Sequence, residues 1–145
     1  MSLDLPAPPS VIWPLFFDVA RVAQLIPGCE QVVEKAPLAA YSAIMKQKVG
    51  PFRLEVPAEI TVEALETERL VRSRTRGRDK YTGTTLDVAL VVMLEPVDDG
   101  TRLAVEATMQ VSGRLASIGY PVVKRKSEEI FIEFGKRLRA QLEMA

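Results

Sequence analysis

The sequence predicts an α+β fold in which a curved antiparallel sheet wraps around a long C-terminal helix. Apolar and polar residues alternate strictly from Leu103 to Val111, as they do in a strand that buries one face. After Gly113 the apolar spacing changes to three and four residues, the pattern of an amphipathic helix, at Val123, Ser127, Ile130, Phe134 and Leu138. A last strand that leads into such a helix favours a sheet folded over the helix, with a cavity between them.

The earlier elements predict the rest of that sheet. A short strand ends at Leu5, the segment Pro8-Pro9-Ser10 opens a first helix, and Asp18 caps a second short helix that Pro27-Gly28 ends. We expect further strands at 30–35, 40–49, 52–64, 69–77, 81–95 and 101–112, joined by tight turns as an antiparallel meander. Residues 1–145 then form one domain. Gly119-Tyr120-Pro121 predicts a late start of the terminal helix, offset from residues 115–118.

Composition excludes several classes of protein. The 145 residues include no histidine and one cysteine, so Ser-His-Asp triads, Cys-His pairs and structural zinc sites are ruled out, and we expect no cofactor, metal or catalytic residue. The 19 basic and 19 acidic residues balance, which argues against binding to nucleic acid. No apolar run is long enough for a transmembrane segment and no signal peptide pattern is present, so a cytoplasmic location is expected.

Four segments resemble a known family. They are Pro6-Ala7-Pro8-Pro9, Ile26-Pro27-Gly28-Cys29-Glu30, Lys48-Val49-Gly50-Pro51-Phe52, and the run from Asp99-Gly100-Thr101-Arg102 to Gly113-Arg114-Leu115-Ala116-Ser117-Ile118-Gly119. In these segments the chain is similar to the carbon monoxide dehydrogenase CoxG family, which belongs to the START-like (SRPBCC) superfamily with the helix-grip fold. The likeness covers nearly the whole chain.

This resemblance implies a non-catalytic accessory protein of a molybdenum-containing, carbon monoxide dehydrogenase-like hydroxylase. Such a protein would help to mature the enzyme, bring it to the membrane, or carry an apolar quinone- or lipid-like ligand. The resemblance therefore also implies peripheral contact with the inner face of the membrane. Two alternatives remain open on the same fold, namely a cyclase- or dehydratase-type enzyme and a pure protein-interaction module.

The side chains that would line the cavity follow from the alternation of the strands and from the start of the terminal helix. Most are apolar, and Gln47 stands out because a buried amide needs a hydrogen-bond partner, whether a ligand carbonyl, water or the backbone. Methionines adapt to flexible apolar guests, although a plain core role is the alternative for both of them. The candidate ligand-binding residues are Tyr41, Met45, Gln47, Val56, Ser73, Thr75, Thr84, Leu86, Met109, Ile118 and Val122.

A second candidate surface lies on the outward face of the strand at 69–77. Arg72, Arg74 and Arg76 share that face because they are two residues apart, and they could bind an acidic partner or anionic headgroups. The alternative is cross-strand pairing with Glu55, Glu59 and Glu63 of the preceding strand. Val91 and Met93 make the next strand apolar on both faces, which favours contact with a partner protein or a second copy of the chain.

Overall fold

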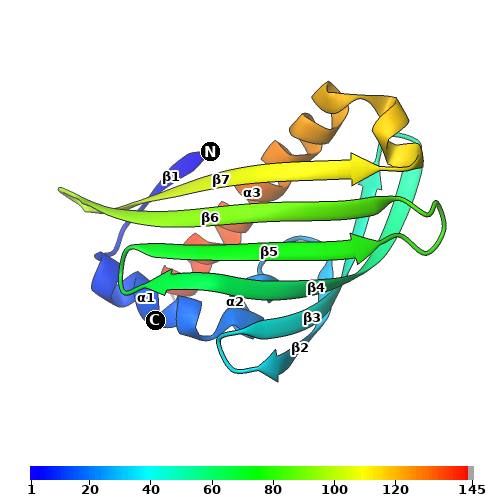
Figure 1. The fold of residues 1–145 in the computed structure, drawn as a ribbon. Helices are drawn as coiled ribbons and strands as arrows, with labels where there is room; N and C mark the ends of the chain where they lie inside the picture. The colour runs from blue at the N-terminus through cyan, green and yellow to red at the C-terminus, as the bar shows by residue number, and fades with distance from the viewer. Residues whose placement is uncertain (144–145) are drawn as a thin grey trace.

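The computed structural model describes residues 1–143, without the side chains of Phe16, Phe17, Val19 and Arg114. Seven strands form one antiparallel sheet in the order β1-β7-β6-β5-β4-β3-β2 (Figure 1). Their bounds are β1 Ser2–Leu5, β2 Cys29–Ala36, β3 Ala40–Val49, β4 Phe52–Glu66, β5 Leu70–Arg78, β6 Thr85–Val97 and β7 Gly100–Ser112. The helices are α1 Pro9–Phe17, α2 Val19–Gln24, the 3₁₀ helix η1 Arg114–Ile118, and α3 Tyr120–Glu143. The predicted curved sheet, long C-terminal helix and two short helices are confirmed.

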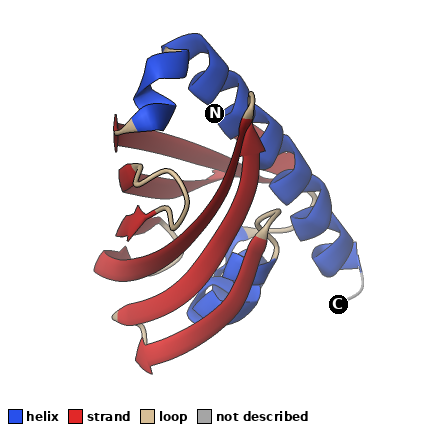
Figure 2. Cartoon of the chain, turned by 90° about the vertical axis from the view of Figure 1, so that its right-hand side faces the viewer, coloured by secondary structure: helices blue, strands red, loops and turns tan. Residues whose placement is uncertain are grey.

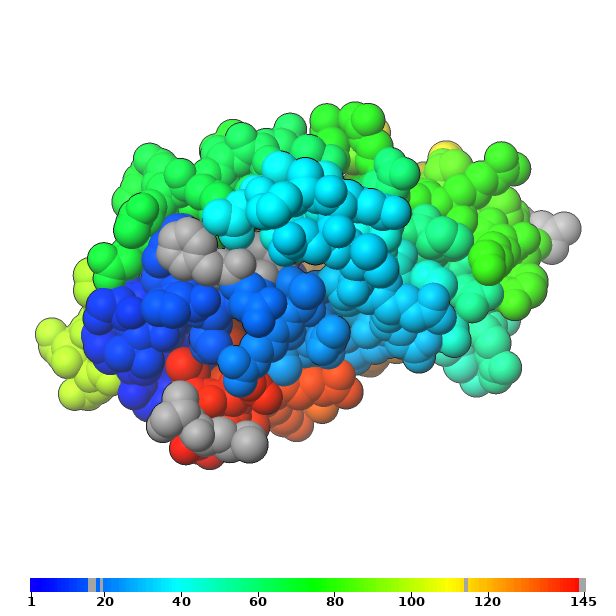
Figure 3. Space-filling model, turned by 90° about the horizontal axis from the view of Figure 1, so that it is seen from below, coloured from blue at the N-terminus to red at the C-terminus, as the bar shows by residue number. Residues whose placement is uncertain are grey.

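The two short helices close one end of the fold. Proline in the first turn of α1 removes a backbone N–H that would have no partner there. The Asp18 side chain accepts a hydrogen bond from the backbone N–H of Arg21 at 3.2 Å and so caps α2. The Arg21 side chain donates to Oε1 of Gln141, which ties α2 to the end of α3. Figure 3 shows these blue helices between the cyan β2–β3 hairpin and the red end of α3.

The strand register assigns every side chain of the sheet to one of two faces. Leu94 and Leu103 lie opposite each other on β6 and β7 and are both buried. Alternation from this pair places residues 86, 88, 90 and 92 of β6 and residues 105, 107, 109 and 111 of β7 on the same face. Helix α3 runs along this inner face (Figure 2), and the opposite, outer face carries the charged residues.

The buried core is divided into two clusters near opposite ends of α3. One contains Leu5, Ile12, Trp13, Leu94, Leu103, Val105 and Leu138, with Phe131 and Phe134 packed against it. The other contains Val49, Leu54, Val56 and Leu115, with Ile118 and Val122 packed against it. Because Leu115, Ile118 and Val122 join one cluster and Phe134 joins the other, the stripes before and after Pro121 differ, as predicted.

The terminal helix has the predicted late start. Gly119, with φ of 89° and ψ of 156°, separates η1 from α3, which begins at Tyr120. This backbone conformation is essentially restricted to glycine. Pro121 lies in the first turn of α3, where proline is favourable, so the break depends on Gly119.

The predicted strand at 81–95 is wrong at its start, because residues 79–84 form a turn and β6 begins at Thr85. The buried carboxylate of Asp79 accepts hydrogen bonds from the backbone N–H groups of Glu55, Tyr81 and Thr82, at 2.6, 3.1 and 2.6 Å. Burial raises the pKa of Asp79, but these hydrogen bonds outweigh it and the pKa lies below its ordinary value. An ionised Asp79 therefore holds the turn against β4.

Candidate functional site

A groove of about 510 Å³ lies between the edge strand β7 and the first half of α3. The inner-face side chains of β7 form one wall, and α3 with the end of η1 forms the other. Ala107 of β7 is exposed even though it points inward, and Tyr120 at the rim is 74% exposed. The groove is lined by Met1, Val105, Glu106, Ala107, Met109, Val111, Ala116, Gly119, Tyr120, Val123, Lys124, Ser127 and Glu128.

Two rows of inner-face residues lead from this groove across the sheet. Reading from β7, the register aligns Met109 with Val88, Thr75, Ile60 and Tyr41, and it aligns Ala107 with Leu90, Ser73 and Val62. From β6 to β4 every member of both rows is only half-buried. We call these residues the inner rows. A sheet face that packed tightly against α3 would bury its apolar residues fully, so the inner rows form the candidate ligand site.

The chemistry of the inner rows is apolar with two hydroxyl groups. Ser73 and Thr75 lie side by side in β5, and within residues 1–143 no hydrogen bond to either hydroxyl is found. None of the inner-row residues is an Asp, Glu, Lys or Arg. The site can therefore bind an apolar molecule by area and offer hydroxyl groups to a carbonyl or hydroxyl of that molecule.

Several candidate ligand-binding residues pack into the cluster at the start of α3. Met45, Leu86, Ile118 and Val122 are partly buried against its buried members, which include Val56. Their inward orientation is as predicted. They form one end of the inner space, while Met109, Thr75 and Ser73 lie in its open middle.

The polar groups of three other candidates are engaged by the protein itself. The Tyr41 hydroxyl accepts a hydrogen bond from the Leu38 N–H at 3.0 Å, and its side chain is 1% exposed. The Gln47 amide nitrogen donates to the carbonyl oxygen of Pro27, so the protein satisfies this amide. Thr84 is fully buried in the 79–84 turn, and its hydroxyl accepts hydrogen bonds from Leu115 N–H and from the Thr82 hydroxyl.

The arginine stripe is neutralised by a residue other than those predicted. Asp87 of β6 lies 3.1 Å from Arg74 Nε and 3.4 Å from Arg76 Nε; the atoms of the Arg74 pair are close enough for an ion pair but are not aligned for a hydrogen bond. Glu59 is opposite Arg76 in the register, but its carboxylate makes no ion pair within the described part of the chain. Arg76 and Asp87 line a shallow hollow of about 930 Å³ on the outer face.

The other two predicted glutamate pairings also fail, for geometric reasons. Glu63 lies at the irregularity in register between Val62 and Ala64, so it has no partner position on β5. Glu55 forms ion pairs with Lys46 and Lys80 instead. Arg72 is exposed opposite Ala64 on one side and Val91 on the other.

Val91 and Met93 are half-buried on the outer face of β6, as their alternation predicts. Leu70 and Ala104 flank Met93 on the neighbouring strands. This small apolar area lies next to Arg72 and stays a candidate contact surface for a partner protein or a second copy.

Sequence reasoning missed the α3 wall of the groove and the importance of Ala107. Val123 and Ser127 were predicted as members of the inward stripe but not as part of the site, although both line the groove. Ala107 carries a signal that was available, because it is the smallest side chain on the inward face of β7 and stands between Val105 and Met109. A small residue in a row of large ones leaves space.

A curved antiparallel sheet closed by a C-terminal helix, with an apolar groove between them, defines a START-like protein with the helix-grip fold. The family model of the carbon monoxide dehydrogenase component CoxG matches residues 2–143. The chain belongs to this family.

Solved structures share the fold at low sequence identity. A conserved protein from Geobacillus kaustophilus aligns with a TM-score of 0.88 at 18% identity, over 99% of this chain and 93% of that one. A protein from Rhizobium leguminosarum aligns with a TM-score of 0.71 at 12% identity, over 100% and 93% of the two chains. The Zhui aromatase/cyclase from Streptomyces sp. R1128 aligns with a TM-score of 0.65 at 12% identity, over 99% and 91%. No curated protein matches the sequence.

Within the described residues, no helix combines the length and the apolar character needed to cross a membrane.

Proposed function

We propose that this protein is a non-catalytic accessory of a carbon monoxide dehydrogenase-like molybdenum hydroxylase and holds an apolar, quinone- or lipid-like molecule between its sheet and α3. The half-burial of the inner rows, between two clusters that are packed, is the observation that carries the ligand proposal. Membership of the carbon monoxide dehydrogenase CoxG family supports the choice of partner enzyme.

The energetics favour an elongated apolar ligand. Burying about 200 Å² of ligand surface would contribute about 5 kcal/mol before the costs of association. The hydroxyls of Ser73 and Thr75 lie in the middle of this surface, where they can donate to a ring carbonyl. The groove beside Ala107 and Met109 gives such a molecule a route to the inner rows.

An enzyme of the cyclase type is the second candidate, because one structure with this fold is an aromatase/cyclase. That chemistry needs an acid and a base in contact with the substrate. The inner rows contain hydroxyl groups but no Asp, Glu, Lys or Arg, which favours a carrier over an enzyme. A pure interaction module would gain nothing from half-buried apolar rows.

The test compares two tryptophan variants by calorimetric titration with decylubiquinone. Met109→Trp places a large ring inside the groove, and we expect affinity to fall at least tenfold. Thr108→Trp is the matched control, because the adjacent residue points to the outer face and is exposed. Equal affinity of the wild type and Met109→Trp would reject the ligand site.

The proposal includes a cytoplasmic location with peripheral contact at the inner face of the membrane. Cell fractionation with and without the partner hydroxylase tests this part, since accessory binding predicts that the two proteins co-purify. Light scattering of the purified chain distinguishes a monomer from a homodimer formed through Val91 and Met93.

A further inference from the structure

The β3–β4 hairpin places two positive charges directly opposite each other. Lys48 and Arg53 are register partners one position from the Val49–Phe52 pair that closes the Gly50-Pro51 turn, and both are exposed on the outer face. Like charges in directly opposite positions destabilise a pair of strands. An anion that lies between the two side chains would remove this repulsion.

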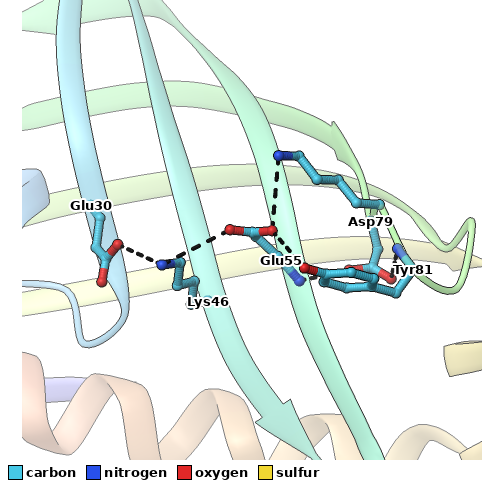
Figure 4. Close-up of polar contacts among 6 residues, drawn as sticks. Glu30, Lys46, Glu55, Asp79 and Tyr81 are labelled. Carbon is cyan, nitrogen blue, oxygen red and sulfur yellow. Dashed lines mark hydrogen bonds and ion pairs between the residues drawn. The ribbon is translucent and has the colours of Figure 1, made fainter.

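The adjacent position of the same ladder is neutralised. Lys46 is opposite Glu55, and Lys46 Nζ lies 3.0 Å from a Glu30 carboxylate oxygen and 3.9 Å from one of Glu55. The hydrogen bond and charge of Glu30 raise the pKa of Lys46. Glu55 also contacts Lys80 at 3.9 Å and accepts a hydrogen bond from the Tyr81 hydroxyl at 3.2 Å (Figure 4). Both nearby carboxylates are therefore occupied.

Lys48 and Arg53 are outside this network. In the part of the chain that the structure describes, neither side chain forms an ion pair. The 79–84 turn, which Asp79 fixes to β4, holds Tyr81 against Glu55. The network and the unpaired cations thus occupy neighbouring positions on a rigid surface.

A hollow of about 440 Å³ lies between the network and the two cations. It is lined by Lys46, Gln47, Lys48, Arg53, Leu54, Glu55 and Tyr81. Three of these side chains are cationic and one is a carboxylate, so the lining has an excess of two positive charges. An anion in the hollow would meet Lys48 and Arg53 on one side and the edge of the network on the other.

We propose that this hollow binds an oxyanion of the phosphate class. The planar guanidinium of Arg53 can donate two parallel hydrogen bonds to two phosphate oxygens, and the Lys48 ammonium supplies a mobile point charge. The Arg74 and Arg76 side chains do not compete, because Asp87 pairs with both. This site is on the opposite face of the sheet from the inner rows and does not depend on the proposed function.

The decisive variant is Lys48→Glu, which turns the like-charge pair into an attractive one. We expect its melting temperature without phosphate to rise above that of the wild type, and its affinity for inorganic phosphate to fall at least tenfold. Lys35→Glu is the matched control, since Lys35 is an exposed β2 residue outside the hollow and the change in charge is the same. That variant should bind phosphate like the wild type.

Calorimetric titration with inorganic phosphate, against sodium chloride of equal ionic strength, is the primary measurement. Flotation with phosphatidylglycerol or phosphatidylcholine vesicles then separates a lipid phosphate from a free one. Binding of either probe that Lys48→Glu abolishes and Lys35→Glu retains supports the site. Binding of neither probe, or equal binding by wild type and Lys48→Glu, overturns it.

Discussion

The backbone N–H of Leu115 donates a hydrogen bond to the side-chain oxygen of Thr84 at 3.2 Å, and both residues are almost completely buried. This contact joins η1, which precedes α3, to the turn between β5 and β6. It therefore fixes where the terminal helix starts relative to the sheet, and with it one end of the inner space.

Replacing Thr84 with valine should destabilise the protein by about 1–3 kcal/mol, because it leaves the buried Leu115 N–H without its acceptor. Denaturant unfolding measures this loss. Thr84→Ser keeps the hydroxyl and should recover most of the difference. Equal destabilisation by serine and valine would show that the methyl group, and not the hydrogen bond, is what matters.

The stability of the 79–84 turn should depend on pH through Asp79. The folded-state pKa of Asp79 lies below its ordinary value of 3.8, so its stabilisation is present above that value and is lost as the pH falls through the lowered pKa. Asp79→Asn should cost about 1–3 kcal/mol at pH 7, because the carboxylate accepts hydrogen bonds from three backbone N–H groups.

Urea unfolding at pH 7 and at pH 3 or below tests this expectation. The difference between wild type and Asp79→Asn should shrink at the acidic end. Asp98→Asn removes an exposed carboxylate from another turn and should have little effect on the free energy of unfolding at pH 7. A difference for Asp79→Asn that is constant across the pH range would contradict the role of its charge.

The arginine stripe can be tested for a role in partner binding separately from stability. Arg74→Ser combined with Arg76→Ser should lower the free energy of unfolding by no more than about 1 kcal/mol, since exposed ion pairs contribute little. If the stripe recruits the hydroxylase, association should weaken and become less sensitive to salt. Lower stability with unchanged association would assign these arginines to pairing with Asp87 alone.

The order and orientation of the elements could be predicted because each depends on local periodicity. The alternation of β7 and the three-and-four spacing of α3 hold over many residues, and Gly119 and Asp18 mark helix boundaries directly. The error at the start of β6 has the same source. Thr82, Thr84 and Leu86 continue the alternation through a turn, whose hydrogen bonds to Asp79 cannot be inferred from spacing.

The candidate site was predicted only in part, because alternation assigns a face and not a depth. Met45 and Leu86 do face inward, but residues of η1 pack against them from a distant part of the sequence. Likewise, the arginines of β5 have two neighbouring strands, and the sequence cannot show that Asp87 on β6 is closer than the glutamates on β4. Both outcomes depend on contacts between distant segments.

The final prediction concerns Gly119, whose backbone separates η1 from α3 beside the groove. An added Cβ would meet Pro121 Cδ at 3.7 Å, an ordinary contact, so any cost of Gly119→Ala comes from the backbone conformation and not from a clash. At φ of 89° and ψ of 156° that cost should be about 1–3 kcal/mol in the free energy of unfolding. Pro121→Ala should cost less, because proline there only favours the first turn of α3. If Pro121→Ala is the more damaging change in denaturant unfolding, then the proline and not the glycine determines where the helix begins.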